Sequence, residues 1–124
     1  MKIQLPQDKG EFWIKNGICY CDLKGDYSIV DAKRFYQKLA EYTEGPIPIL
    51  GLNRKLHSIS REARVFYANE SASFACAVAI LTQSPVSKVI GNFFVGLNKP
   101  SIPTRLFTLE QDALNWLLEF KNGK

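Results

Sequence analysis

The sequence predicts one α/β domain with a mixed, mostly parallel sheet, an N-terminal β-hairpin and about four helices. Strand-like segments alternate with amphipathic helical segments, which is typical of parallel sheets covered by helices. Asn16-Gly17 separates the first two strand-like segments, and Asn-Gly suits the tight turn of a hairpin. Segment 74–81 is almost continuously apolar, as expected for a central strand that is covered on both faces.

The hairpin joins segments 11–15 and 18–22. Apolar side chains alternate with more polar neighbours in the first segment, which indicates a sheet with one well-buried face. Asp22 and Asp26 follow closely, and two carboxylates can share acid–base chemistry. We interpret 22–26 instead as a solvated turn.

A helix and a short strand are expected next. Ser28 is predicted to cap the helix, because a hydroxyl at this position accepts from a backbone N–H and Asp31 follows three residues later. Gly45-Pro46 is predicted to end it. Segment 47–52 is predicted to be a buried strand, and Pro48 places it at an edge or makes it begin late, because proline lacks an N–H for the ladder.

The second half repeats this alternation. Ser60 is the predicted cap of a second helix, and Ser84-Pro85 opens a third that extends to about residue 97. A last strand over 102–107 leads to a final helix, for which Thr108 and Gln111 are predicted to form a capping box. The core face of that helix is expected to hold Leu109, Ala113, Trp116, Leu117 and Phe120.

Length and composition fit a single domain over residues 1–124, with 46% hydrophobic and 23% charged residues. No apolar run is long enough for a membrane span, and the first residues lack the apolar core of a signal peptide. We therefore expect a cytoplasmic protein without membrane insertion. The net charge of +4 is too small to indicate nucleic-acid binding without a concentrated basic patch.

The residues available for catalysis are few. His57 is the one histidine, and Cys19, Cys21 and Cys76 all fall on predicted strands. Buried packing is the usual role of such cysteines, and the ligands for a metal site are too few. We expect no cofactor, no metal and no enzymatic activity; a hydrolase that uses His57 is the alternative that these residues favour least.

The stretch from Arg54 to Arg64 is the best candidate site. It is predicted to leave the carboxyl end of a strand and enter a helix N-terminus, where open α/β sheets bind ligands and backbone N–H groups attract anions. The candidate phosphorylation or anion site consists of Ser58, Ser60, Arg61 and Arg64. The candidate partner surface consists of Arg54, Lys55 and His57. A solvated basic loop, with Ser60 as an ordinary cap, is the simpler alternative.

Several stretches together resemble the SpoIIAA-like fold, which is shared by STAS domains and small bacterial STAS/SEC14-type proteins. They are the hairpin 13–22, the segments 60–64, 75–81 and 89–94, and the final strand and helix over 105–117. The resemblance implies regulation by protein contact, with a phosphorylatable serine at the start of a helix, a place that Ser58 or Ser60 occupies. The Asp-Ser-Ser-Gly-like sequence usual in STAS antagonists is absent here.

The sequence therefore favours a non-enzymatic regulatory or protein-interaction domain of STAS type, switched by phosphorylation at a helix N-terminus. A small-molecule binding protein is the alternative, with an apolar ligand such as a lipid under the predicted helical segment 86–97, or an anion at residues 54–64. Related SEC14-type domains hold lipids between sheet and helix. Self-association through an edge strand or an apolar helix face stays open.

Overall fold

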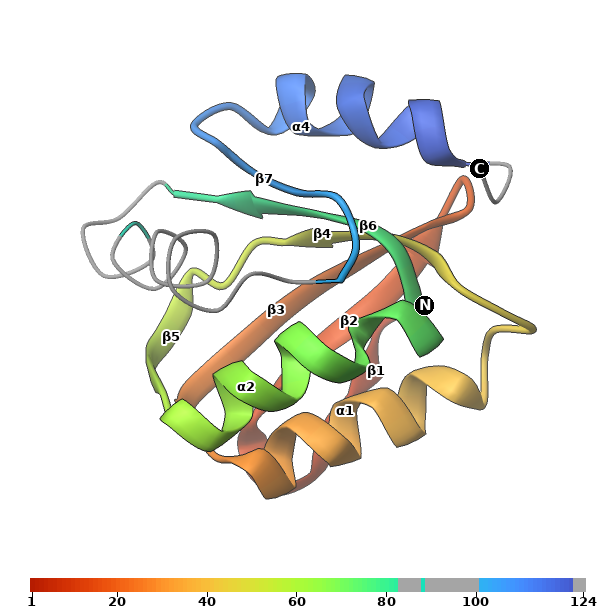
Figure 1. Cartoon of the computed structure of the whole chain (residues 1–124). Coiled ribbons are helices and arrows are strands. Elements are labelled where there is room, and N and C mark those ends of the chain that lie inside the picture. The colour runs from red at the N-terminus through yellow and green to blue at the C-terminus, as the bar shows by residue number, and fades with distance from the viewer. Residues whose placement is uncertain (83–87, 89–100, 122–124) are drawn as a thin grey trace.

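The computed structural model describes residues 1–82, 88 and 101–121 (Figure 1). Its strands are β1 (Ile3–Gln4), β2 (Gly10–Lys15), β3 (Ile18–Tyr27), β4 (Ile47–Gly51), β5 (Lys55–Ile59), β6 (Ala75–Leu81) and β7 (Thr104–Phe107). Its α-helices are α1 (Ile29–Ala40), α2 (Arg61–Glu70) and α4 (Glu110–Leu117). Short 3₁₀ helices are η1 (Pro6–Asp8), η2 (Ser71–Ser73) and η3 (Leu118–Phe120).

The strands form one mixed sheet in the order β1-β2-β3-β4-β6-β7, with β5 also paired to β3. The pairs β1–β2 and β2–β3 are antiparallel, and the other four pairs are parallel. Helices α1 and α2 cover one face of the sheet and α4 lies on the other (Figure 1). The predicted mixed, mostly parallel α/β sheet is confirmed. The described residues hold three α-helices where about four were expected, and the helix predicted to begin at Ser84-Pro85 lies outside them.

Local sequence signals explain the hairpin and the first helix. Asn16 and Gly17 have positive φ angles of 54° and 76°, as the predicted tight turn requires. Ser28 and Asp31 form the predicted capping box, in which each side chain bonds to the other residue's backbone N–H. Helix α1 ends at Ala40, before the predicted end at Gly45-Pro46.

Two hydrophobic clusters hold the layers together. The cluster between the sheet and helices α1 and α2 is rich in aromatic rings, and Tyr36 stacks on Phe74 with ring centroids 4.2 Å apart. The cluster beneath α4 contains Ala113 and Leu117, both fully buried. Strand β6 lies between β4 and β7 as the predicted central strand.

Four local predictions are wrong. Segment 22–26 is part of the long strand β3, not a solvated turn, and Asp22 is buried there. Pro48 lies inside the sheet, at the point where the register between β4 and β6 shifts. Helix α4 begins after Leu109, which is 60% exposed and makes no side-chain cap, so the capping box predicted at Thr108 and the core position predicted for Leu109 are both incorrect.

The stretch from Arg54 to Arg64 was also expected to be a loop before the second helix. Its first half is strand β5, parallel to the carboxyl-terminal part of β3. Ser60 then caps α2 as predicted, because its hydroxyl accepts from the Ala63 N–H at 3.1 Å. The polar residues Lys55, His57 and Ser58 are exposed along β5, and its buried residues Leu56 and Ile59 attach it to the core.

Candidate functional site

A cavity of about 90 Å³ lies between the sheet and helices α1 and α2. Strands β3 to β7, both helices and η2 contribute to its wall. The apolar and aromatic residues that line it are Cys21, Leu23, Phe35, Tyr36, Ile49, Gly51, Leu56, Ile59, Tyr67, Val78 and Ile80. The polar residues that line it are Asn53, Ser71 and Thr104. This composition is typical of small-molecule sites, in which a few polar groups orient a ligand within an apolar wall.

The lining groups that could ionise stay neutral. Burial raises the pKa of Tyr36 and Tyr67 above the ordinary tyrosine value of 10.0. Burial also raises the pKa of the Cys21 thiol well above 9.0. Desolvation disfavours the charged form of each group, so these walls carry no charge near neutral pH.

The Ser71 side chain is a buried polar group of this wall. Ser71 is 4% exposed, and its hydroxyl has no hydrogen-bond partner in the described parts of the chain. Its backbone is satisfied, because its N–H donates to the Tyr67 carbonyl and its carbonyl accepts from the Phe74 N–H. The Thr104 hydroxyl, in contrast, donates to the Ile102 carbonyl at 3.1 Å. A buried polar atom without a partner is rare in folded proteins and requires an explanation.

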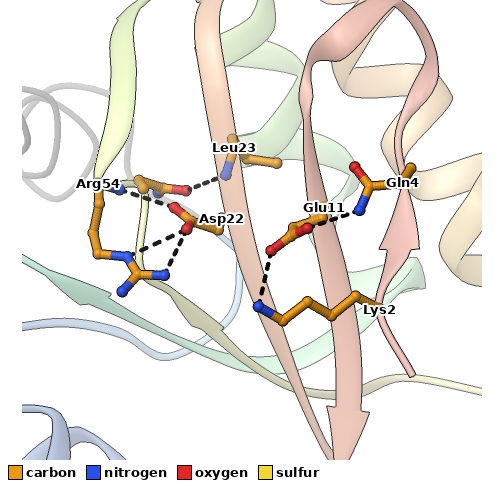
Figure 2. Close-up of polar contacts among 7 residues, drawn as sticks. Lys2, Gln4, Glu11, Asp22, Leu23 and Arg54 are labelled. Atoms are coloured by element: carbon orange, nitrogen blue, oxygen red, sulfur yellow. Dashed lines mark hydrogen bonds and ion pairs between the residues drawn. The ribbon is translucent and has the colours of Figure 1, made fainter.

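The connection between β4 and β5 is fixed to β3 by a buried carboxylate (Figure 2). Asp22 accepts from the Arg54 backbone N–H at 3.0 Å and from Nε and Nη2 of its guanidinium at 3.2 and 2.8 Å. Asn53 has a positive φ of 48°, and its side-chain oxygen accepts from the Leu23 N–H at 3.3 Å. Since Asn53 lines the cavity, these contacts hold one end of its wall.

A second polar cluster lies on the neighbouring strands (Figure 2). Glu11 pairs with Asp22 in the β2–β3 register and contacts Lys2 at 3.2 Å and Gln4 at 2.8 Å. These bonds hold the pKa of the Glu11 carboxyl below 4.5, first through Gln4 and then through Lys2. The contacts tie β1 to β2 on the surface, outside the cavity.

The structure separates the predicted site residues into two groups. On β5, Lys55, His57 and Ser58 are exposed, and the Ser58 hydroxyl donates to the Asp26 carboxylate at 2.7 Å. Arg54 belongs to the Asp22 contact, although its side chain is still 57% exposed. The expected partner surface is therefore the outer side of a strand, with Ser58 bonded to an acidic neighbour.

The other group surrounds the start of α2. The Ser60 hydroxyl is engaged as the helix cap, and Arg61 is exposed beside it. Arg64 turns back toward the same helix end, where its Nη1 donates to the Ile59 carbonyl at 2.6 Å. Ser60 and Arg64 thus lie at the same end of α2, whereas Ser58 lies on β5.

Sequence reasoning did not identify the cavity. Tyr67 and Ser71 are not among the predicted binding residues, and Asn53 directly precedes the predicted stretch from Arg54 to Arg64. No local pattern marks them, since the cavity forms only when the strands and helices come together. Asn53 has a positive φ, a conformation that asparagine adopts more readily than most residue types. Its residue type is therefore the one signal that the sequence offers for this part of the wall.

The cysteines fit the predicted structural role. None of the three forms a disulfide, Cys19 and Cys21 are buried, and burial raises the pKa of the Cys19 thiol to about 12. In the part of the chain that the structure describes, no three His, Cys, Asp or Glu residues are grouped as a metal site would require. None of the helices described is long and apolar enough to cross a membrane. The cytoplasmic location stays a prediction.

Comparison with known proteins identifies a family and a fold. The family described as "Domain of unknown function (DUF7793)" matches residues 12–121. A crystal structure of an uncharacterised DUF3478 family protein from Shewanella loihica PV-4, described as having a SpoIIAA-like fold, is similar over 86% of this chain and 90% of that one, with a TM-score of 0.52 and 18% identity. This likeness confirms the predicted fold.

A protein of unknown function from Arthrobacter sp. FB24 is 28% identical over 86% of this chain and 97% of that one, with a TM-score of 0.32. No curated protein matches the chain.

Proposed function

The chain belongs to the family described as domain of unknown function DUF7793, and we propose that its SpoIIAA-like domain is a non-enzymatic binding module for a small apolar molecule. The observation that carries this proposal is the apolar cavity between the sheet and helices α1 and α2. Its wall comes from elements distant in sequence, as in most ligand sites of folded domains.

Size and polarity narrow the ligand. An engineered apolar cavity of about 150 Å³ accommodates benzene. The cavity of about 90 Å³ is of the same order, so it suits a single compact apolar body, such as a five-membered carbocycle or a short branched chain. Burying such a body stabilises the complex through removal of apolar surface from water.

The test is an NMR titration of the whole chain with cyclopentane. We expect saturable shifts of backbone amides along the cavity wall, at Leu23, Ile49 and Tyr67. Val78→Phe fills the cavity from β6 and should abolish these shifts, whereas Val65→Phe, on an α2 residue that is 36% exposed, should leave them unchanged. If Val78→Phe does not fold by circular dichroism, Val78→Leu takes its place. Shifts that are absent, or that persist in the filled variant, would contradict the proposal.

A second candidate is the regulatory protein-interaction domain that the sequence favours, with phosphorylation at the start of α2. The supporting observation is that Arg64 turns toward the helix end capped by Ser60, beside the exposed Arg61. A phosphate on Ser60 would place acceptor oxygens near two guanidinium groups and the N-terminus of a helix. Ser58 is less suited, because its hydroxyl already donates to the Asp26 carboxylate, which a phosphate would face.

Mass spectrometry of the protein from its own cells tests this candidate. Cleavage after glutamate releases residues 45–62 as one peptide that contains both serines. We expect phosphate on Ser60 in at least one growth state. Full coverage without phosphate on Ser58 or Ser60 across several growth states would leave the cavity as the working site.

A further inference from the structure

The contacts of Ser71 do not reveal a structural role for its buried hydroxyl. It lies where α2 passes into η2, a place where a serine hydroxyl commonly donates to a carbonyl one turn earlier. Here the hydroxyl makes no hydrogen bond among the residues that the structure describes, although Ser71 is 4% exposed. Leaving such a group unpaired costs free energy that alanine at the same position would avoid.

Ser71, which carries this hydroxyl, is one of the residues that line the cavity. Most of the other residues that line the cavity are aromatic or aliphatic, and Tyr67 lies one turn before Ser71 on α2. A molecule that fills the cavity therefore meets an apolar surface with a hydrogen-bonding group in it. A serine hydroxyl both donates and accepts, so it can bond to an alcohol, a carbonyl or an amide.

Resting on the proposed function, we infer that Ser71 is the anchor of the ligand, and that the ligand is a small uncharged molecule with an apolar body and one hydrogen-bonding group. The hydrogen bond is made in the complex and completes the bonding of the hydroxyl. Ser71 is therefore a specificity-determining residue, which separates polar-tipped ligands from pure hydrocarbons.

The wall argues for an uncharged ligand. The lining residues that the structure describes include neither a lysine, arginine or histidine nor an aspartate or glutamate. Moving an ionised group from water into such a wall without a partner of opposite charge is strongly unfavourable. A single neutral hydrogen bond to Ser71 cannot compensate for that loss, so amines and carboxylates should be rejected.

The experiment compares cyclopentanol, cyclopentane and cyclopentylammonium as NMR probes of the wild-type chain, Ser71→Ala and Ser73→Ala. Ser73 is an exposed serine in the same 3₁₀ helix and serves as the matched control. We compare the ratio of cyclopentanol affinity to cyclopentane affinity between variants, because the different water solubilities of the probes then cancel. We expect Ser71→Ala to weaken cyclopentanol about fivefold and to leave cyclopentane unchanged, with no effect from Ser73→Ala.

The possible results separate the two levels of the proposal. If neither neutral probe binds the wild-type chain, the proposed function fails and the anchor with it. If both bind, but Ser71→Ala changes them equally or not at all, the cavity binds ligands and the anchor is overturned. Binding of cyclopentylammonium as tightly as cyclopentanol overturns the restriction to uncharged ligands. Ser71→Ala should resist urea at least as well as the wild-type chain, and this result shows that a loss of binding does not come from unfolding. If Ser71→Ala does not fold, Ser71→Cys, whose thiol is a weaker donor, replaces it.

Discussion

The contact between Asp22 and Arg54 should stabilise the fold because it is buried, whereas an equally short contact on the surface should not. The Asp22 carboxylate is 5% exposed and accepts from three N–H groups of Arg54. Removing one partner of a fully buried pair costs about 3–5 kcal/mol, because the other charge is left without compensation. The Arg54 side chain is 57% exposed, so water can replace part of what it supplies.

We therefore expect Arg54→Ala to lower the free energy of unfolding by about 1–2 kcal/mol, and Asp22→Ala by about 2–3 kcal/mol. The aspartate variant costs more because the Arg54 backbone N–H, which donates at 3.0 Å, also loses its acceptor. The double variant should lose less than the sum of the two, with a coupling of about 1 kcal/mol. Urea unfolding followed by tryptophan fluorescence measures all four proteins, with a constant slope as evidence that the unfolded state is unchanged.

The control is the contact between Lys24 and Asp8, whose Nζ–Oδ2 distance is 2.9 Å, close to the 2.8 Å between Arg54 Nη2 and Asp22. Both of its side chains are exposed, at 42% and 81%. Exposed pairs contribute little, so the same cycle on Lys24 and Asp8 should show no measurable coupling. Equal coupling in the two cycles would refute the reasoning that burial, and not distance, determines the contribution.

Three further predictions concern single residues. Ser60→Ala should lower the free energy of unfolding by about 1 kcal/mol in urea, while Ser60→Asp, which can still cap α2, should unfold close to wild type; equal losses would contradict the capping role. Because burial raises the pKa of Cys19 from 9.0 to about 12, the free energy of unfolding should fall as pH rises above 9 toward 12. Native Cys19 should also resist a thiol reagent that modifies it in urea. Rapid modification of native Cys19 would count against its burial. Burial tends to raise the pKa of Asp31, but bonds from Ser28 and Lys9 outweigh burial and hold that pKa below 3.8. The stability that Asp31 contributes should therefore persist at pH 4 and disappear as pH falls further. In an acid titration of unfolding, Asp31→Asn should lack this pH dependence.

The sequence was a reliable guide where the structure depends on neighbouring residues. The turn at Asn16-Gly17 follows from backbone angles that those two residues tolerate, and the caps at Ser28 and Ser60 need only a partner three residues away. The almost continuous apolar run over 74–81 also identified the central strand. Each of these signals acts within a few residues, so no knowledge of the rest of the fold is needed to interpret it.

Strand β5 escaped detection because its pairing is irregular. Leu56 pairs with Gly25 and Ser58 with Asp26, so β5 has one more residue than β3 at this point, at His57. The extra residue places the two buried side chains of β5 three positions apart instead of two. The alternation that marks a strand is thereby lost, and the basic residues made the segment resemble a solvated loop.

Asp22 and the cavity escaped for a different reason. A carboxylate is seldom buried without a partner, and its partner Arg54 lies 32 residues further along the chain, so no local pattern joins them. The cavity depends on how five strands, two helices and a 3₁₀ helix fit together. Only the three-dimensional arrangement makes an ordinary serine at the end of α2 a candidate binding residue.

Strand β5 belongs to both candidate sites, because it lines the cavity, carries Ser58 and leads to Ser60. A negative charge should have different effects at the two serines. The inward side chains of β5, Leu56 and Ile59, line the cavity, so a ligand there should hold β5 in place. A negative charge on Ser58 would face the Asp26 carboxylate of β3 and oppose the pairing of the two strands. A charge on Ser60 would instead reinforce the cap of α2. Coupling between two binding sites is reciprocal. Ser58→Asp should therefore weaken cyclopentanol binding, whereas Ser60→Asp should leave it unchanged. Equal effects of the two substitutions would show that β5 does not connect the surface to the cavity.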